Sequence, residues 1–197
     1  MHTQSSAQIV LASSSRYRRE LLTRLGLEFS TAAPEVDETP IAGEPASQLA
    51  LRLANAKAHA VAKDFPAALI IGSDQVAMLG STPLNKPGNY KNAAQQLRLM
   101  SGHAVSFFTA LCLLNTRTRR VHSDVVTVTV RMRRLSEAQI DRYLRADQPY
   151  DCAGSARIEA LGITLVHGIE SDDPSALIGL PLIRLCDMLA AEGIELP

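Results

Sequence analysis

The chain has 197 residues, 46% of them hydrophobic, and its 20 lysines and arginines balance its 20 aspartates and glutamates. A chain of this length can bury a core that is stable without disulfides or a structural metal, so residues 1–197 are expected to form a single domain. A net charge of zero provides no long-range field to attract DNA or RNA, which argues against a nucleic-acid-binding protein. Sixteen of the basic residues are arginines, whose planar guanidinium groups match phosphate oxygens two at a time. This excess favours a site for phosphate groups.

Signals that would place the chain in other classes are missing from the sequence. The three cysteines match neither a zinc-binding spacing nor a disulfide framework, and the five histidines form no His-x-His or His-Glu-x-x-His pair. Residues 1–6 lack the charged start and apolar run of a signal peptide. No apolar stretch approaches the ~20 residues of a membrane span. A cytoplasmic protein without a membrane anchor is therefore expected.

Strand patterns occur at four places along the chain. Short apolar runs predict buried strands at residues 9–12 and 69–72. Two longer runs, at residues 104–114 and 121–132, are separated by a polar segment and predict a pair of antiparallel strands.

Helical spacing of apolar residues alternates with these strands. It predicts a helix that follows the serines at 13–15 and ends at Gly26, and further helices over residues 46–64, 89–100, 136–145 and 181–191. Because strands and helices alternate, the predicted fold is α/β, with a mixed, twisted sheet flanked by helices and a cleft between two lobes.

The first candidate site lies between the opening strand and its helix, where residues 13–19 read SSSRYRR. The amino terminus of a helix presents unpaired N–H groups and a partial positive charge to anions, and here hydroxyls and arginines stand beside it. Three arginines at a helix start oppose the helix dipole unless an anion is bound, which favours a phosphate site. The alternative is that Ser15 caps the helix while the arginines face solvent.

The second candidate follows the strand at 69–72, where residues 71–75 read IGSDQ. Ligands of α/β proteins collect at the carboxyl ends of strands, and an aspartate directly after a buried apolar run needs a partner or a metal ion. Asp74 is therefore a candidate base or metal ligand. The alternative is an aspartate that orders its own turn through a local hydrogen bond.

Other charged residues are weaker candidates. The acidic segment 35–38 offers carboxylates for a metal ion, and Lys57 and Lys86 offer cations for phosphates, although a lysine on a helix is by default solvated. Residues 151–159 read DCAGSARIE, a loop of small residues that ends in Glu159. Its carboxylate suits the N1–H and amino edge of a guanine, and the alternative is a surface turn with an exposed glutamate.

Together and in this order, these segments resemble the Maf family of nucleotide pyrophosphatases. The matching segments span nearly the whole chain and are 11–19 (LASSSRYRR), 33–38 (APEVDE), 71–75 (IGSDQ), 86–87 (KP), 152–155 (CAGS) and 178–182 (IGLPL). Members of this family hydrolyse nucleoside triphosphates to the monophosphate and pyrophosphate with a divalent metal ion, Mg²⁺ or Mn²⁺. The resemblance implies a nucleotide substrate, and because dimers are common in the family it leaves a homodimer open.

The resemblance also implies roles for individual residues. It makes Asp74 the proton acceptor that activates water, and it places Glu38 and Asp74 at the metal. The positions that hold the triphosphate correspond to Ser13, Arg18, Lys57 and Lys86. These roles agree with the chemistry, because the attack builds negative charge on phosphate oxygens, which a metal and fixed cations stabilise while a carboxylate takes the proton.

Three positions indicate a branch of the family. The branch that acts on dTTP and UTP has Ser-Pro-Arg-Arg in the opening loop and Asp-Thr after the strand, whereas this chain has Tyr17 and Gln75 there. With Glu159, these residues resemble the specificity positions of the 7-methyl-GTP branch, which usually carries proline and tryptophan where this chain has Arg16 and Tyr17. N7-Methylguanine is positively charged, so an aromatic ring stacks on it with a cation–π contribution of about 0.5–2 kcal/mol. This resemblance implies an enzyme that removes 7-methyl-GTP from the nucleotide pool.

Two alternatives stay open at this point. One is a pyrophosphatase of the same family that acts on dTTP, UTP and their modified forms. The other is a nucleotide-binding regulator of septum formation that binds without turnover, since the family name is attached to inhibition of septation. The intact set of Glu38, Lys57, Asp74 and Lys86 argues against a loss of catalysis.

Overall fold

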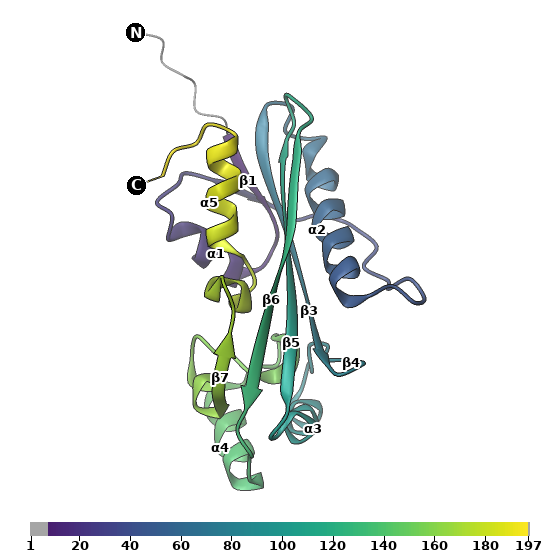
Figure 1. The fold of residues 1–197 in the computed structure, drawn as a ribbon, viewed down its shortest axis with the longest axis vertical. Helices are drawn as coiled ribbons and strands as arrows, with labels where there is room; N and C mark the ends of the chain where they lie inside the picture. The colour runs from purple at the N-terminus through teal and green to yellow at the C-terminus, as the bar shows by residue number, and fades with distance from the viewer. Residues whose placement is uncertain (1–7, 197) are drawn as a thin grey trace.

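The computed structural model describes residues 8–196, so the segment examined for signal-peptide features lies outside the described residues. It contains a seven-stranded mixed sheet with helices on both faces (Figure 1). The strands are β1 (Gln8–Ala12), β2 (Ser30–Ala32), β3 (Ala68–Leu79), β4 (Thr82–Pro83), β5 (Ala104–Asn115), β6 (Val121–Met132) and β7 (Val166–Glu170). They are ordered β2-β1-β3-β5-β6-β7, with β4 paired to β3. The predicted α/β class and its mixed sheet flanked by helices are confirmed.

The helices agree closely with the apolar spacing of the sequence. They are α1 (Arg16–Thr23), α2 (Ala46–Ala62), α3 (Tyr90–Met100), α4 (Glu137–Asp147) and α5 (Leu182–Ala191), with short 3₁₀ turns η1 (Ala153–Ser155), η2 (Leu161–Leu165) and η3 (Pro174–Ile178). The strands β2, β4 and β7 were not predicted, because two are very short and the third lacks an apolar run. Within residues 8–196, no helix is long and apolar enough to cross a membrane.

Side chains mark the starts of three helices. The Ser15 hydroxyl accepts a hydrogen bond from the Arg18 amide at the start of α1. Asn89 caps α3 in the same way, and Ser136 and Gln139 form a capping box at the start of α4. These bonds satisfy amide groups that have no partner within the helix. Ser15 therefore caps α1 as the alternative expected, but Arg18 does not face solvent, because it donates to the Gly179 carbonyl.

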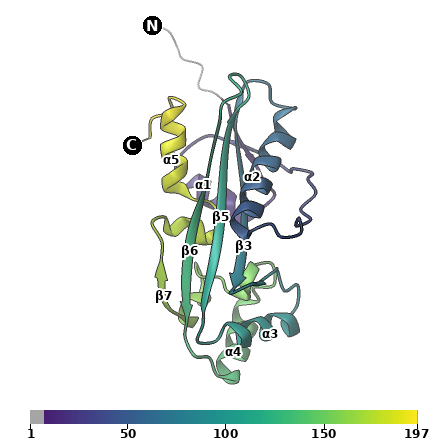
Figure 2. The ribbon, with the colours of Figure 1, turned by 45° about the vertical axis from the view of Figure 1, so that its right-hand side comes forward.

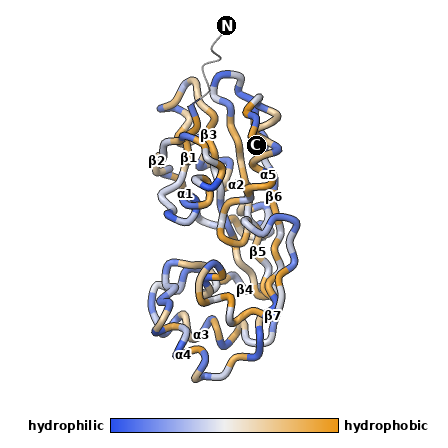
Figure 3. The backbone as a smooth tube through the Cα atoms, turned by 90° about the vertical axis from the view of Figure 1, so that its left-hand side faces the viewer, coloured by the Kyte–Doolittle hydropathy of each residue, from blue (hydrophilic) through white to orange (hydrophobic). Residues whose placement is uncertain are grey.

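The three long strands β3, β5 and β6 run the length of the molecule and connect an upper and a lower half (Figures 1 and 2). In the upper half, α1 and α5 cover one face of the sheet and α2 covers the other. The lower half holds α3, α4, β4 and β7, and the same division is visible from the side in Figure 3. The predicted cleft between these halves stays a prediction.

Alternation along the strands separates the core into clusters. On the α1 and α5 face of the upper sheet, buried residues include Leu11, Leu22, Ile71, Leu113 and Leu185. On the α2 face they include Val10, Ala54, Ala58, Ile70 and Cys112. The lower half has its own cluster, which includes Leu97, Phe107, Val130, Ile140 and Leu144. Successive strand residues point to opposite faces, so neighbours such as Val10 and Leu11 belong to different clusters.

The predicted end of the second strand at Gly72 is wrong. Strand β3 continues to Leu79, because β5 pairs with it antiparallel along nearly its whole length. Asp74 therefore lies within a strand, opposite Ala110, and does not order a turn. The parallel ladder with β1 does end at Gly72, which pairs with Ala12. As a result, Ser13 and Asp74 both lie just beyond the same end of the β1–β3 ladder.

Candidate active site

A charged cluster joins α2, β3 and the segment that precedes α2. Lys57 Nζ is 2.6 Å from Asp74 Oδ1 and 2.7 Å from Glu38 Oε1. The side chains of Lys57 and Asp74 are 9% and 11% exposed, whereas that of Glu38 is 59% exposed. Burying an ammonium is costly unless it is paired, and here two carboxylates surround it. The default expectation that Lys57 is solvated is therefore wrong.

A close approach of α2 to β3 brings Lys57 to this place. A Cβ atom at Gly72 would lie 2.2 Å from the Ala54 carbonyl oxygen and 2.9 Å from the Ala58 nitrogen, which is closer than atoms can approach. Only glycine therefore permits the observed spacing between helix and strand. Lys57 lies on the same helix between these two alanines, and Asp74 is two residues beyond the glycine on the same face of the strand.

The environment of Asp74 alters its proton affinity. Burial raises the pKa of this carboxyl above its ordinary value of 3.8, and the opposing effects of Lys57 and Arg18 are smaller. Desolvation penalises the charged form of a carboxyl, whereas neighbouring cations favour it. A carboxylate with a raised pKa and a cation that holds its orientation suits a group that accepts a proton from water.

The loop between β1 and α1 places Ser13 beside the same end of the ladder, and the first turn of α1 places Arg18 there. The Ser13 hydroxyl oxygen accepts hydrogen bonds from the Ser15 amide at 3.1 Å and from Arg18 Nη1 at 3.4 Å. Arg18 Nε donates to the carbonyl oxygen of Gly179 at 2.9 Å, and the Ser73 hydroxyl donates to the same oxygen at 3.0 Å. This carbonyl thus ties α1 to β3, and its residue has a φ of +124°, which favours glycine.

The charges of this loop and of the cluster influence each other. Burial lowers the pKa of the Arg18 guanidinium, and the negative charges of Asp74 and Glu38 act in the opposite direction. The structure therefore brings five of the predicted residues to one region, namely Ser13, Arg18, Glu38, Lys57 and Asp74.

Gln75 lies on the opposite face of β3 from Asp74. Its Nε2 atom donates hydrogen bonds to Thr109 Oγ1 at 2.9 Å, to the Ala176 carbonyl at 2.9 Å and to the Leu177 carbonyl at 3.1 Å. In this structure it fastens η3 to the sheet. Its role in substrate specificity stays a prediction.

Tyr17 connects α1 to the segment that precedes η1. Its hydroxyl donates to Asp151, with oxygen separations of 3.2 and 3.1 Å to the two carboxylate atoms. Arg16 Nη2 donates to the Tyr17 hydroxyl oxygen at 2.6 Å. The sequence contained Asp151 within a candidate loop but gave no signal that this carboxylate meets the first helix.

Lys86 and Glu159, the two remaining predicted site residues, are exposed. Within the described part of the chain, neither forms an ion pair with the cluster around Asp74. The loop that leads to Glu159 is fixed by Arg157, whose guanidinium pairs with the buried carboxylate of Asp147 and whose amide donates to the Tyr143 hydroxyl at 2.9 Å. Sequence reasoning missed Asp147, because an acidic residue at the end of a helix is ordinarily solvent-exposed.

The donors near Lys57 fit a divalent metal ion that binds together with its substrate. Glu38 and Asp74 both direct carboxylate oxygens to Lys57 Nζ, so the two carboxylates lie near each other. Hard cations such as Mg²⁺ are typically held by one or two carboxylates, with phosphates and water as the other ligands. Over residues 8–196, no group of three or more His, Cys, Asp or Glu side chains could hold a metal ion. The fit is therefore to a shared site and not to a cage made by the protein alone.

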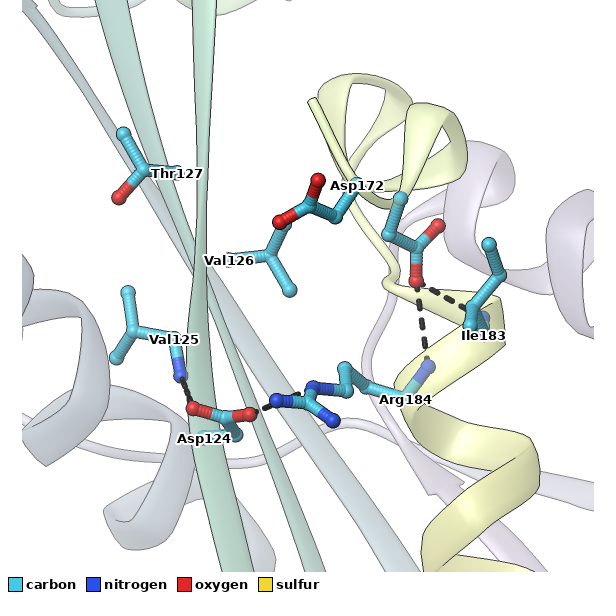
Figure 4. A pocket seen from close by; sticks show the side chains of 8 residues that line it. Asp124, Val125, Val126, Thr127, Asp172, Ile183 and Arg184 are labelled. Atoms are coloured by element: carbon cyan, nitrogen blue, oxygen red, sulfur yellow. Dashed lines mark hydrogen bonds and ion pairs between the residues drawn. The ribbon is translucent and has the colours of Figure 1, made fainter. Parts of the chain in front are cut away.

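A recess of about 460 Å³ lies elsewhere, between β6 and the start of α5 (Figure 4). It is lined by Asp124, Val125, Val126, Thr127, Asp172, Asp173, Ile183 and Arg184. Asp124 pairs with Arg184 at 2.8 Å, and Asp173 accepts a hydrogen bond from the Ile183 amide at 2.8 Å. Because protein groups already engage Asp124 and Asp173 and no predicted site residue lines the recess, we assign no chemistry to it.

Comparison with known proteins identifies the family. The profile of the Maf-like protein family matches residues 8–192, a range that includes every site residue described above. The chain belongs to the Maf family.

Three relatives of this chain carry the same name. A protein named 7-methyl-GTP pyrophosphatase from Thiobacillus denitrificans is 56% identical over 98% of this chain and 96% of its own length. Proteins of the same name from Methylobacillus flagellatus and Pseudomonas aeruginosa are 55% and 51% identical, over 95% and 96% of this chain and 97% and 98% of their own lengths.

Proposed function

We propose that this protein hydrolyses 7-methyl-GTP to 7-methyl-GMP and pyrophosphate, and so removes a modified nucleotide from the pool. The observation that carries the reaction is the buried Asp74 carboxylate, held 2.6 Å from Lys57 at the end of the β1–β3 ladder. The substrate is supported by relatives that are 50–56% identical to nearly the whole chain and are named for this activity.

In this proposal the chain holds the triphosphate with cations and hydroxyls. Ser13 contacts it from the loop after β1, Arg18 from the first turn of α1, Lys57 from α2 and Lys86 from the segment after β4. The four come from different elements, and those nearest Asp74 are pre-positioned by their contacts within the protein. Fixed cations stabilise the charge that develops on phosphate oxygens without having to reorganise during the reaction.

The chemical step breaks the anhydride bond between the α and β phosphates. A water molecule attacks the α-phosphorus, its proton passes to Asp74, and pyrophosphate leaves with the electron pair of the broken bond. The raised pKa of Asp74 makes it a better proton acceptor than an exposed aspartate. Glu38 and Asp74 would hold Mg²⁺ or Mn²⁺, which supplies charge stabilisation to the phosphate oxygens.

Recognition of the base is assigned to Tyr17, Gln75 and Glu159. The Tyr17 ring stacks on the cationic base, and the Glu159 carboxylate accepts hydrogen bonds from its N1–H and amino edge. Gln75 supports this region from β3 through its hydrogen bonds to η3. A purine that carries a methyl group and a positive charge suits such a pocket better than a pyrimidine does.

We assign residues 1–197 to one domain, because the strands β3, β5 and β6 run through both halves of the structure. The protein works in the cytoplasm on a small nucleotide, without nucleic-acid partners, and as a homodimer if it follows its family.

The test is pyrophosphate release from 7-methyl-GTP, GTP, UTP and dTTP in the presence of Mg²⁺, measured beside the Asp74→Asn variant. A strong preference for 7-methyl-GTP that disappears in the variant supports the proposal. Preference for UTP or dTTP would instead assign the chain to the branch of the family that acts on these two nucleotides. Nucleotide binding without any pyrophosphate release would instead favour a non-catalytic regulator.

A further inference from the structure

One face of the Tyr17 ring is covered by a neighbouring side chain of the protein. The guanidinium carbon of Arg16 lies 4.7 Å from the centre of this ring. That distance is within the range of a cation–π contact. The same guanidinium donates to the Tyr17 hydroxyl oxygen at 2.6 Å, so the two neighbouring side chains on α1 form a stacked pair.

Asp151 holds this pair from across the sequence. Its Oδ2 atom is 3.4 Å from Arg16 Nη2 and 3.1 Å from the Tyr17 hydroxyl. The side chains of Arg16 and Asp151 are 54% and 53% exposed. Ion pairs this exposed contribute little to stability, so the contact is readily broken. Arg16 is therefore held over the Tyr17 ring by contacts that a ligand can displace.

We propose that Arg16 is an intramolecular competitor for the stacking face of Tyr17, and that it sets the affinity for the cationic base. The inference rests on the proposed function, which assigns the ring to the base. A guanidinium and N7-methylguanine are both planar, delocalised cations, so each is attracted to the same ring face. The base can stack on that face only after Arg16 has moved away.

The expected change in affinity for the base follows from the fraction of molecules in which Arg16 leaves the ring uncovered. A cation–π contact of the strength usual at exposed sites, taken alone, leaves this face of the ring uncovered in roughly 15–30% of molecules. The proposal places the base on the face that Arg16 covers, so only the uncovered form binds it and the observed affinity falls to that fraction of its intrinsic value. Removal of Arg16 is therefore expected to tighten binding about three- to sixfold.

The experiment is an NMR titration with 7-methylguanosine, which carries the cationic base and no phosphate. This probe prevents Arg16 from contributing through phosphate contacts. The matched control is Arg19→Ala, which removes the same charge from an exposed position of α1. We expect Arg16→Ala to bind the nucleoside about three- to sixfold more tightly than wild type, and Arg19→Ala to bind it as wild type does. In a Tyr17→Ala background, Arg16→Ala should have no effect.

An unchanged or weaker affinity in Arg16→Ala would overturn the inference, as would a gain that persists without the tyrosine ring. The failure of the proposed function looks different, because wild-type protein would then release no pyrophosphate from 7-methyl-GTP. If pyrophosphate is released but the nucleoside affinity of Arg16→Ala does not rise, the function stands and the competitor role of Arg16 is rejected.

Discussion

Lys57 Nζ lies 2.6 Å from Asp74 Oδ1, although the first residue is on a helix and the second is in the middle of a strand. The contact is buried, and the exposed Glu38 lies 2.7 Å from the same ammonium. Arg18 is within electrostatic reach of both carboxylates, so two cations and two carboxylates balance in this region. The geometry thus holds the Asp74 carboxylate in a fixed, buried position beside Lys57.

Asp74→Asn keeps the shape of the side chain but removes its ability to accept a proton. We expect kcat to fall by at least about 10²-fold while nucleotide binding is retained. Pyrophosphate release and a separate binding titration measure these two quantities. Asp64→Asn, at an exposed position after α2, is the control and should retain wild-type activity. If Asp74→Asn keeps most of its activity, Asp74 is not the base.

Glu38→Gln tests the proposed metal position. Loss of the carboxylate should raise the Mg²⁺ concentration for half-maximal activity by at least about tenfold, because a metal bound by few protein groups depends on each of them. Titration of activity with Mg²⁺ at saturating nucleotide measures this. Glu35→Gln, an exposed glutamate of the same acidic segment, provides the comparison. An equal shift in both variants would mean a general charge effect and no specific site.

Gly72→Ala tests the close approach that positions Lys57. The new methyl group would lie 2.2 Å from the Ala54 carbonyl oxygen, so α2 must move away from β3. We expect a loss of about 1–3 kcal/mol in the free energy of unfolding, together with a lower kcat. Denaturant unfolding and pyrophosphate release measure the two effects. Wild-type stability and activity in this variant would show that the helix does not need its observed position.

Two substitutions at Tyr17 separate its ring from its hydroxyl. Tyr17→Ala should lower kcat/KM for 7-methyl-GTP about two- to thirtyfold more than for UTP, because only the methylated purine gains the cation–π contact. Tyr17→Phe keeps the ring and should retain most of the preference. Steady-state kinetics on both nucleotides measure the ratio. Equal losses on the two substrates after Tyr17→Ala would rule out stacking as the source of specificity.

The contacts of Glu192, at the end of α5, predict that its carboxylate stabilises the folded protein in a pH-dependent way. Its side chain is 4% exposed, and it accepts hydrogen bonds from Asn115 at 2.5 Å and His122 at 2.8 Å. Burial alone would raise the pKa of this carboxyl, but these bonds and the charge of Arg120 lower it below its ordinary value of 4.5. A lowered pKa contributes stability that is present above pH 4.5 and is lost as the pH falls through the folded-state pKa.

Glu192→Gln should therefore lower the free energy of unfolding by about 1–3 kcal/mol at pH 7. Below about pH 4.5 the free energies of unfolding of the variant and of wild type should approach each other. Thermal or denaturant unfolding across this pH range measures it. Glu195→Gln, at a nearby exposed position, should have little effect at any pH. A constant difference between wild type and Glu192→Gln from pH 7 to pH 3 would contradict the assignment.

Much of the fold could be predicted because local patterns govern it. The helices 46–64 and 89–100 were expected from apolar spacing and appear as α2 and α3, and the strand at 121–132 appears with the same bounds as β6. The end of β3 could not be predicted in this way. Residues 73–75 are polar and resemble a turn, but pairing with β5 keeps them extended. Tertiary hydrogen bonding here overrides local preference.

The features of the candidate site could likewise be predicted only in part. The residue types and their order, from the serine and arginine loop to Asp74 and the small-residue loop, can be read from the chain alone, because composition and spacing are local properties. The burial of Lys57 against Asp74, the placement of Gln75 on the other side of the sheet and the contact of Arg16 with Tyr17 beside Asp151 arise only in the folded protein. These relationships depend on how closely helices pack on strands and on which segments distant in sequence meet, and no local pattern encodes either.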